Sequence, residues 1–104
     1  MQQISIFELL DERRIEDMSC LEIAQEIAGR FGKEATKSRF EGYYEFKSGK
    51  CLIVIGKHRY YPEVHGGAWH ISVDFQYKDG GYACPCDSFE EAIRRIGSWI
   101  ERHK

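Results

Sequence analysis

The segment from His70 to Lys78 alternates strictly between apolar and polar side chains. The apolar set is Ile71, Val73, Phe75 and Tyr77, and the polar set is His70, Ser72, Asp74 and Gln76. Because successive side chains of a strand point to opposite faces, this pattern predicts a half-buried antiparallel strand. A chain that contains such a strand needs further strands beside it and a cover for one face only.

Three further strands are expected beside this segment. Tyr43 to Lys47 and Cys51 to Lys57 flank a Ser-Gly turn, and that glycine suits a hairpin. Asp79-Gly80 is a second hairpin signal. It leads into a short strand, Tyr82 to Cys84, which Pro85 ends or confines to a sheet edge.

Two amphipathic helices are predicted at the two ends of this series of strands. The first, Ser19 to Phe31, opens with a capping box formed by Ser19 and Glu22. The second opens with Ser88 and Glu91. Its expected apolar stripe is Phe89, Ile93, Ile96 and Ile100, flanked by Ala92 and Trp99.

The order α-β-β-β-β-α predicts an α+β fold, with an antiparallel sheet covered on one face by two helices. The other face is then left in water, and it is where a functional site is expected. It would carry the polar set defined above, with Tyr43 and Glu45 as neighbours.

The chain is expected to form one domain over residues 1–104, with 1–17 as an N-terminal arm or short helix and 18–104 as the core. Its 104 residues, 42% of them hydrophobic, suffice for one core, and no linker or repeat divides them. With no long apolar run and no signal-peptide pattern, we expect a cytoplasmic protein without a membrane contact. Its four cysteines are expected to be reduced thiols.

Residues 3–7, Gln-Ile-Ser-Ile-Phe, closely resemble the pentapeptide Gln-Leu-Ser/Asp-Leu-Phe with which bacterial DNA-replication and repair proteins dock on the sliding clamp. The resemblance covers five residues, with isoleucines at the two usual leucine positions. It implies that Gln3 is a hydrogen-bonding anchor and that Ile6 and Phe7 are apolar plugs, with Ile4 beside them in the partner contact.

A structural alternative exists for the same residues. Ser5 and Glu8 form a possible capping box, and Ile4 could pack against Leu9 as a hydrophobic staple. This arrangement would start a short helix that ends at about Arg14 and packs its apolar side chains on the domain.

The opening Gln-Gln-Ile-Ser-Ile-Phe-Glu-Leu-Leu is also similar to those of many small proteins of phages and mobile elements of Gram-positive bacteria. The resemblance implies a non-enzymatic, anti-CRISPR-like inhibitor that binds host machinery. The expected partner is a host DNA-handling or defence complex, such as a CRISPR effector or the sliding clamp. The oligomeric state is left open.

The middle of the chain is its only basic stretch. Residues 30–60 carry eight lysines and arginines against Glu34, Glu41 and Glu45. Because positive charge interleaved with tyrosines suits single-stranded nucleic acid, segment 30–61 predicts a small nucleic-acid-binding domain as the alternative function. Its candidate residues are Lys37, Arg39, Tyr43, Lys47, Lys50, Lys57 and Arg59. The net charge of -2 and the Glu-Glu pair that opens the last helix oppose phosphate binding and favour a protein partner.

Metal and catalytic sites have less support in the sequence. Cys84 and Cys86, separated by Pro85, are the candidate thiolate ligands, and His58, His65 and His70 lie in or beside the expected strands. Zinc needs four ligands, however, and a second close pair is missing, so no metal and no cofactor are predicted. No nucleophile elbow, phosphate-binding glycine loop or pair of carboxylates stands out, so no catalytic residue is predicted either.

Overall fold

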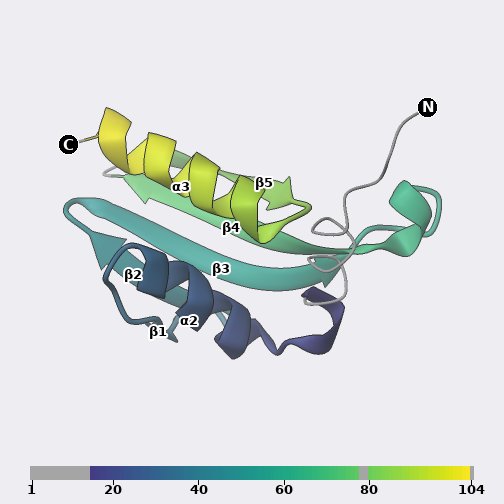
Figure 1. Ribbon diagram of the computed structural model, residues 1–104. Coiled ribbons are helices and arrows are strands. Elements are labelled where there is room, and N and C mark those ends of the chain that lie inside the picture. The colour runs from purple at the N-terminus through teal and green to yellow at the C-terminus, as the bar shows by residue number, and fades with distance from the viewer. Residues whose placement is uncertain (1–14, 78–79, 104) are drawn as a thin grey trace.

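The sheet is a meander of five antiparallel strands in the order β1-β2-β3-β4-β5 (Figure 1). The computed structural model describes residues 15–77 and 80–103. The strands are β1 (Thr36–Lys37), β2 (Tyr44–Ser48), β3 (Cys51–Arg59), β4 (Trp69–Tyr77) and β5 (Gly80–Cys86). The helices are α2 (Cys20–Arg30) and α3 (Phe89–Arg102), and the 3-10 turn η1 (His65–Gly67) lies between β3 and β4. The predicted α+β class is therefore confirmed, with β1 as an additional strand that two residues make too short to show a period.

The two long central strands, β3 and β4, form the middle of the sheet. They pair without interruption from Cys51 opposite Tyr77 to Arg59 opposite Trp69. On β4, Ile71, Val73 and Phe75 are fully buried. The polar residues between them are half-buried, so the predicted alternation of β4 is confirmed.

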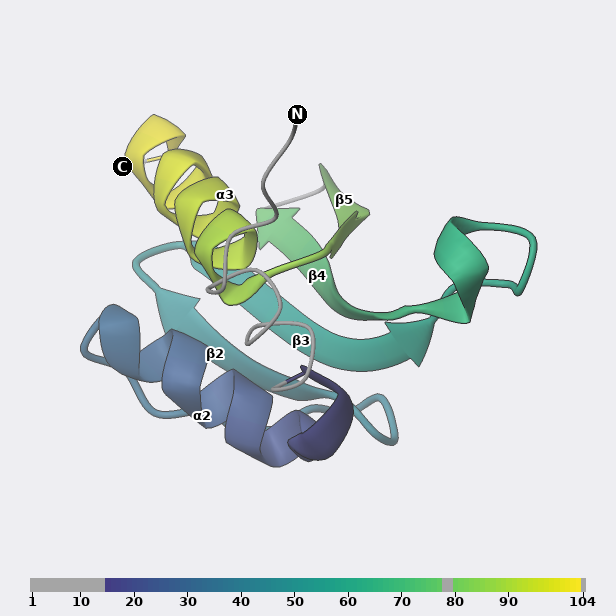
Figure 2. The ribbon, with the colours of Figure 1, turned by 45° about the vertical axis from the view of Figure 1, so that its right-hand side comes forward.

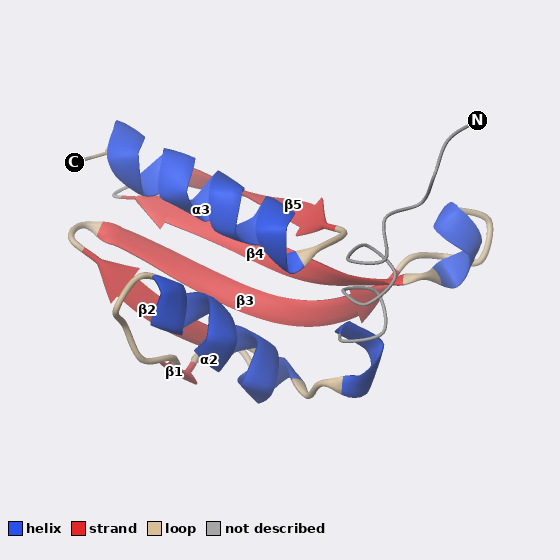
Figure 3. Cartoon of the chain, viewed as in Figure 1, coloured by secondary structure: helices blue, strands red, loops and turns tan. Residues whose placement is uncertain are grey.

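Both helices lie on the same face of the sheet (Figures 2 and 3). The capping box of α2 is complete, because Glu22 N–H donates to Ser19 Oγ and Ser19 N–H donates to Glu22 Oε1. At α3, Glu91 N–H donates to Ser88 Oγ over 3.1 Å. The Glu91 carboxylate does not return to Ser88 but accepts from Asp87 N–H, also over 3.1 Å. The predicted start of α3 at Ser88 is therefore confirmed, but the Glu91 side chain bonds to the backbone of Asp87 and not to that of Ser88.

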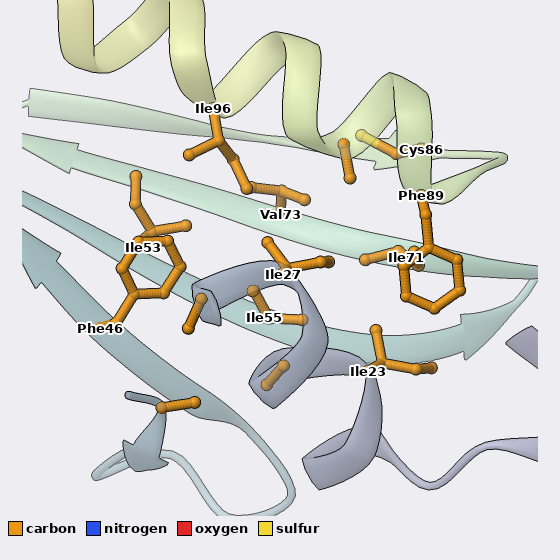
Figure 4. Packing of buried hydrophobic residues seen from close by; sticks show 14 of the residues in the cluster. Ile23, Ile27, Phe46, Ile53, Ile55, Ile71, Val73, Cys86, Phe89 and Ile96 are labelled. Carbon is orange, nitrogen blue, oxygen red and sulfur yellow. The ribbon is translucent and has the colours of Figure 1, made fainter. Parts of the chain in front are cut away.

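The core fills the layer between this sheet face and the helices (Figure 4). The buried stripe of α3 consists of Phe89, Ala92, Ile96 and Trp99. All four residues of the predicted stripe contact the core, but Ile93 and Ile100 are only partly buried, whereas Ala92 and Trp99, expected at its flanks, are buried. The helix is rotated by a fraction of a turn, which brings the large Trp99 ring over Phe75 at a centroid distance of 5.4 Å.

Strand β5 is longer than expected, because it runs through Pro85 to Cys86. It is an edge strand, where a proline need not supply an N–H to a second neighbour. At Gly81, an added Cβ would overlap the Phe75 carbonyl oxygen, so the backbones approach more closely there than a side chain permits. The expected turn residue Asp79 lies outside the described residues.

We expect Ile96→Ala to lower the free energy of unfolding by about 2–5 kcal/mol, because it leaves a cavity between α3 and the sheet. Leu21→Ala, at a position of α2 that is 40% exposed, is the control and should cost much less. Chemical denaturation measures both changes. Equal losses in the two variants would contradict the packing described for α3.

Candidate functional site

The sheet face opposite the helices, called the open face below, has no helix over it in the described parts of the chain. Its composition follows from the register of the strands. One cross-strand row is Glu45, Val54, Asp74 and Ala83, and the next is Lys47, Leu52, Gln76 and Gly81. Val54 is only 2% exposed although it is not part of the core cluster. The open face is therefore closely packed although it is not part of the core.

At the end of the open face near η1, four rings and a carboxylate form a line across the sheet, called the ring row below. It comprises Tyr43, His58, His70, Tyr60 and Asp87. The Tyr43 hydroxyl and His58 Nε2 are hydrogen-bonded over 2.5 Å. The His58 and His70 ring centroids are 6.1 Å apart, and those of His70 and Tyr60 are 4.2 Å apart. The row ends where the Tyr60 hydroxyl donates to Asp87 Oδ1 over 2.8 Å.

The strand register explains how residues far apart in the sequence meet in this row. His58 lies directly opposite His70 in the β3–β4 pair. Tyr43, just before β2, lies over the backbone of Gly56 on β3, where a Cβ would overlap its ring. Glycine at position 56 therefore gives the Tyr43 ring its place on the sheet.

The ring row continues towards the β1 edge through Phe40. The Phe40 ring meets Tyr43 edge-on at a centroid distance of 6.5 Å and is 45% exposed. Arg39 Cζ lies 5.0 Å from the centroid of the Phe40 ring, in a cation–π arrangement. This corner adds an exposed aromatic side chain and a positive charge to the row.

The electrostatic setting of His70 favours its neutral form. Burial lowers the pKa of His70 first, and the neighbouring His58 lowers it further, whereas Asp87 acts in the opposite direction. No hydrogen-bond partner for His70 Nδ1 is found among the described residues. A neutral imidazole between two other rings gives the centre of the row an apolar character near pH 7.

Tyr60 is also held in its neutral form. Burial raises the pKa of Tyr60, and the hydrogen bond to the Asp87 carboxylate raises it further. The phenol therefore stays protonated and donates to Asp87. These contacts hold the Tyr60 ring in one orientation against His70.

The structure separates the residues predicted to bind nucleic acid. Tyr43 and Lys47 lie on the open face, with Arg39 at its corner. Lys37 is exposed on β1, and Lys50 is exposed in the β2–β3 turn. Lys57 and Arg59 belong to the odd-numbered positions of β3, which face the helix side. The seven residues do not form one surface.

Lys57 and Arg59 also have partners within the fold. Lys57 Nζ donates to the carbonyl oxygens of Glu16 and Met18 over 2.7 and 2.8 Å. Arg59 Nε donates to the Gly67 carbonyl oxygen over 2.9 Å. Both cations lie over the Trp69 ring, at 4.6 and 5.4 Å from its centroid. Their contacts hold the segment before α2 and the turn η1 against the sheet.

The cysteine pair lies on the helix side of β5. Cys86 is buried and Cys84 is half-buried, and both are free thiols. Burial raises the pKa of Cys86, and the neighbouring Cys84 raises it further. Within residues 15–77 and 80–103, no group of three or more histidine, cysteine or acidic side chains is placed to hold a metal ion.

The residues predicted to dock on a sliding clamp, Gln3, Ile4, Ile6 and Phe7, lie outside the described residues. Clamp docking stays a prediction. Neither described helix has the length and hydropathy that a membrane span requires.

Searches of protein-family models, curated proteins and solved structures found no match for the chain.

Sequence reasoning anticipated part of the ring row and missed the rest. His70 and Tyr43 were expected on the open face, whereas His58, Tyr60 and Asp87 were not placed there. Their meeting depends on register across three strands, which a local pattern does not give. The one local signal was Gly56, a glycine inside an apolar strand, which indicates a close approach of another group.

We expect Gly56→Ala to destabilise the protein by about 1–3 kcal/mol, because the new methyl group displaces the Tyr43 ring. In a Tyr43→Ala background the same change should cost much less, since the space is then open. A double-mutant cycle from denaturation curves measures this coupling. Equal costs in both backgrounds would show that the ring does not lie on Gly56.

A second prediction concerns pH. Because the pKa of His70 is lower in the folded chain than its ordinary value of about 6.5, the unfolded chain binds the proton more readily. The contribution of His70 to the free energy of unfolding is therefore complete above pH 7, and it falls as the pH drops below about 6.5.

Denaturation at pH 7.5 and 5.5 tests this effect. The stability of the wild type should fall more between the two pH values than that of His70→Gln. A variant that loses as much stability on acidification as the wild type would contradict the assignment to His70.

Proposed function

We propose that this chain is a non-enzymatic protein-binding module whose contact surface is the open face, centred on the ring row. The supporting observation is the ring row itself: four rings, two from tyrosines, lie side by side on a sheet face that neither described helix covers. Tyrosine is enriched in protein interfaces and in the few residues that contribute most of the binding energy.

The ring row is also held in place before any partner binds. Tyr43 is fixed by Gly56 and by its hydrogen bond to His58, and Tyr60 by its hydrogen bond to Asp87. Side chains that are already ordered lose little conformational entropy on binding. A partner can therefore gain most of the energy of contact with these rings.

The charge of the open face indicates the chemistry of the partner. Glu45 and Asp74 lie on it and Asp87 lies at its end, against Lys47 on the same face and Arg39 at its corner. This excess of carboxylates fits a partner surface that combines apolar and basic side chains. Proteins that handle nucleic acids carry basic surfaces of this kind.

This partner chemistry agrees with the expectation drawn from the sequence. We propose a host DNA-handling or defence complex as the partner, and a role of the chain as a phage or mobile-element factor that inhibits or modulates it. The same carboxylates would repel phosphates, so direct nucleic-acid binding at the open face is the weaker alternative.

The charge of the open face can be tested by neutralising it. We expect Glu45→Gln together with Asp74→Asn to weaken partner binding at least about fivefold, on the scale of 1 kcal/mol that exposed charge pairs contribute. The measurement is quantitative capture from a nuclease-treated lysate of the source cells, followed by titration of the captured protein.

The matched control is Glu34→Gln together with Glu63→Gln, two exposed glutamates of the loops that remove the same charge. Equal weakening in both pairs would contradict a contact at the open face. Capture that is seen from an untreated lysate and lost from the nuclease-treated one would indicate nucleic acid as the partner in place of a protein.

A further inference from the structure

A second surface feature lies on the helix side of the sheet, where α3 runs beside the edge strand β5. It is a hollow of about 260 Å³, called the arginine hollow below. Its lining residues are Tyr82, Arg94, Arg95, Ser98 and Arg102. Positions 94, 98 and 102 are four residues apart on one helix and therefore share a face of α3. The hollow thus combines three guanidinium groups with the side chains of a serine and a tyrosine.

The positive charge of the hollow is only partly balanced. Arg95 Nε and Glu91 Oε1 form an ion pair over 3.1 Å. Arg94 and Arg102 are exposed and have no side-chain hydrogen bond or ion pair to another described residue. Three like charges on one part of a helix repel one another, and an anion between them relieves that repulsion.

We propose that the arginine hollow binds the phosphate group of a nucleotide unit. Guanidinium groups match the oxygens of a phosphate with paired hydrogen bonds, and they stay charged at every physiological pH. The volume is below the roughly 300–1,000 Å³ of pockets that enclose a drug-sized ligand, so the hollow holds one charged group and not a whole cofactor.

Tyr82 indicates that the phosphate belongs to a nucleotide. Its ring packs against Phe75 at a centroid distance of 5.0 Å and against Trp99 at 5.3 Å. The side chain remains 44% exposed, so it presents a fixed aromatic surface beside the arginines. A base attached to the bound phosphate can stack on this surface, as bases do in single-strand binding sites.

This site is independent of the open face and of the basic segment 30–61. It lies on the helix side, and none of its arginines comes from that segment. The phosphate is carried by a free nucleotide or by a single strand, because both present the same group. The experiment therefore includes probes of both kinds.

The test is titration of the full chain with inorganic phosphate, AMP and an eight-residue oligothymidylate, at several salt concentrations, followed by tryptophan fluorescence. The test variant is Arg94→Gln together with Arg102→Gln. The control variant is Arg30→Gln together with Lys33→Gln, two exposed cations at the end of α2 that remove the same charge. Thermal unfolding of each variant verifies folding.

We expect the test pair to weaken binding of AMP or the oligonucleotide at least tenfold, and the control pair less than twofold. Because the hollow holds one phosphate group, the logarithm of the oligonucleotide association constant should fall with the logarithm of salt concentration with a slope of about −0.7. In the test pair, which loses this contact, the slope should approach zero. Tighter binding of the oligonucleotide than of AMP identifies a single strand as the source, and equal binding identifies a nucleotide.

Two results would overturn the proposal. One is the absence of saturable binding of any probe at millimolar concentration, and the other is an equal loss in the test and control pairs. Inorganic phosphate that binds as tightly as AMP would overturn the role of Tyr82. None of these results affects the proposal for the open face, whose test measures capture of a protein partner.

Discussion

The pairing of β3 with β4 is the constraint on which the rest of the structure depends. Nine consecutive residue pairs join the two strands, from Cys51 opposite Tyr77 to Arg59 opposite Trp69, beside the turn η1. One side of this ribbon supplies Ile53, Ile55, Ile71 and Val73 to the core, and the other side supplies His58 and His70 to the ring row. A shift of the register by one residue would exchange the two sides. Folding of the core and assembly of the ring row are thus consequences of one register.

Features that depend on a few neighbouring residues were predictable from the sequence. The alternation of β4 gave its two faces, and the serines before α2 and α3 gave the helix starts, because strand pleat and helix capping are local effects. The rotation of α3 was not predictable. Phe89, Ile93, Ile96 and Ile100 make an acceptable stripe on their own, but the space beside Phe75 accommodates the ring of Trp99, and this shifts the stripe.

The candidate site was harder to predict from the sequence, for a related reason. The faces of Lys57 and Arg59 follow from their odd positions on β3. The sequence therefore contained the information that their side chains point to the other face of the sheet from His58. The ring row needed the registers of β2, β3 and β4 together, and these are fixed by contacts across the chain. Charge density along the sequence was misleading. The basic middle segment is spread over two faces, whereas two adjacent arginines of α3 and a third about two turns further on gather at one hollow.

Pro85 in the edge strand affects how the protein behaves at high concentration. The outer side of an edge strand carries backbone groups that can pair with the edge of another molecule, and such pairing can continue into fibres. Pro85 removes one donor from the outer half of β5, which interrupts a continuous ladder between two copies. At the opposite edge of the sheet, the short β1 pairs with part of β2. The two edges of the sheet can therefore resist strand-to-strand polymerisation, although neither described helix covers its open face.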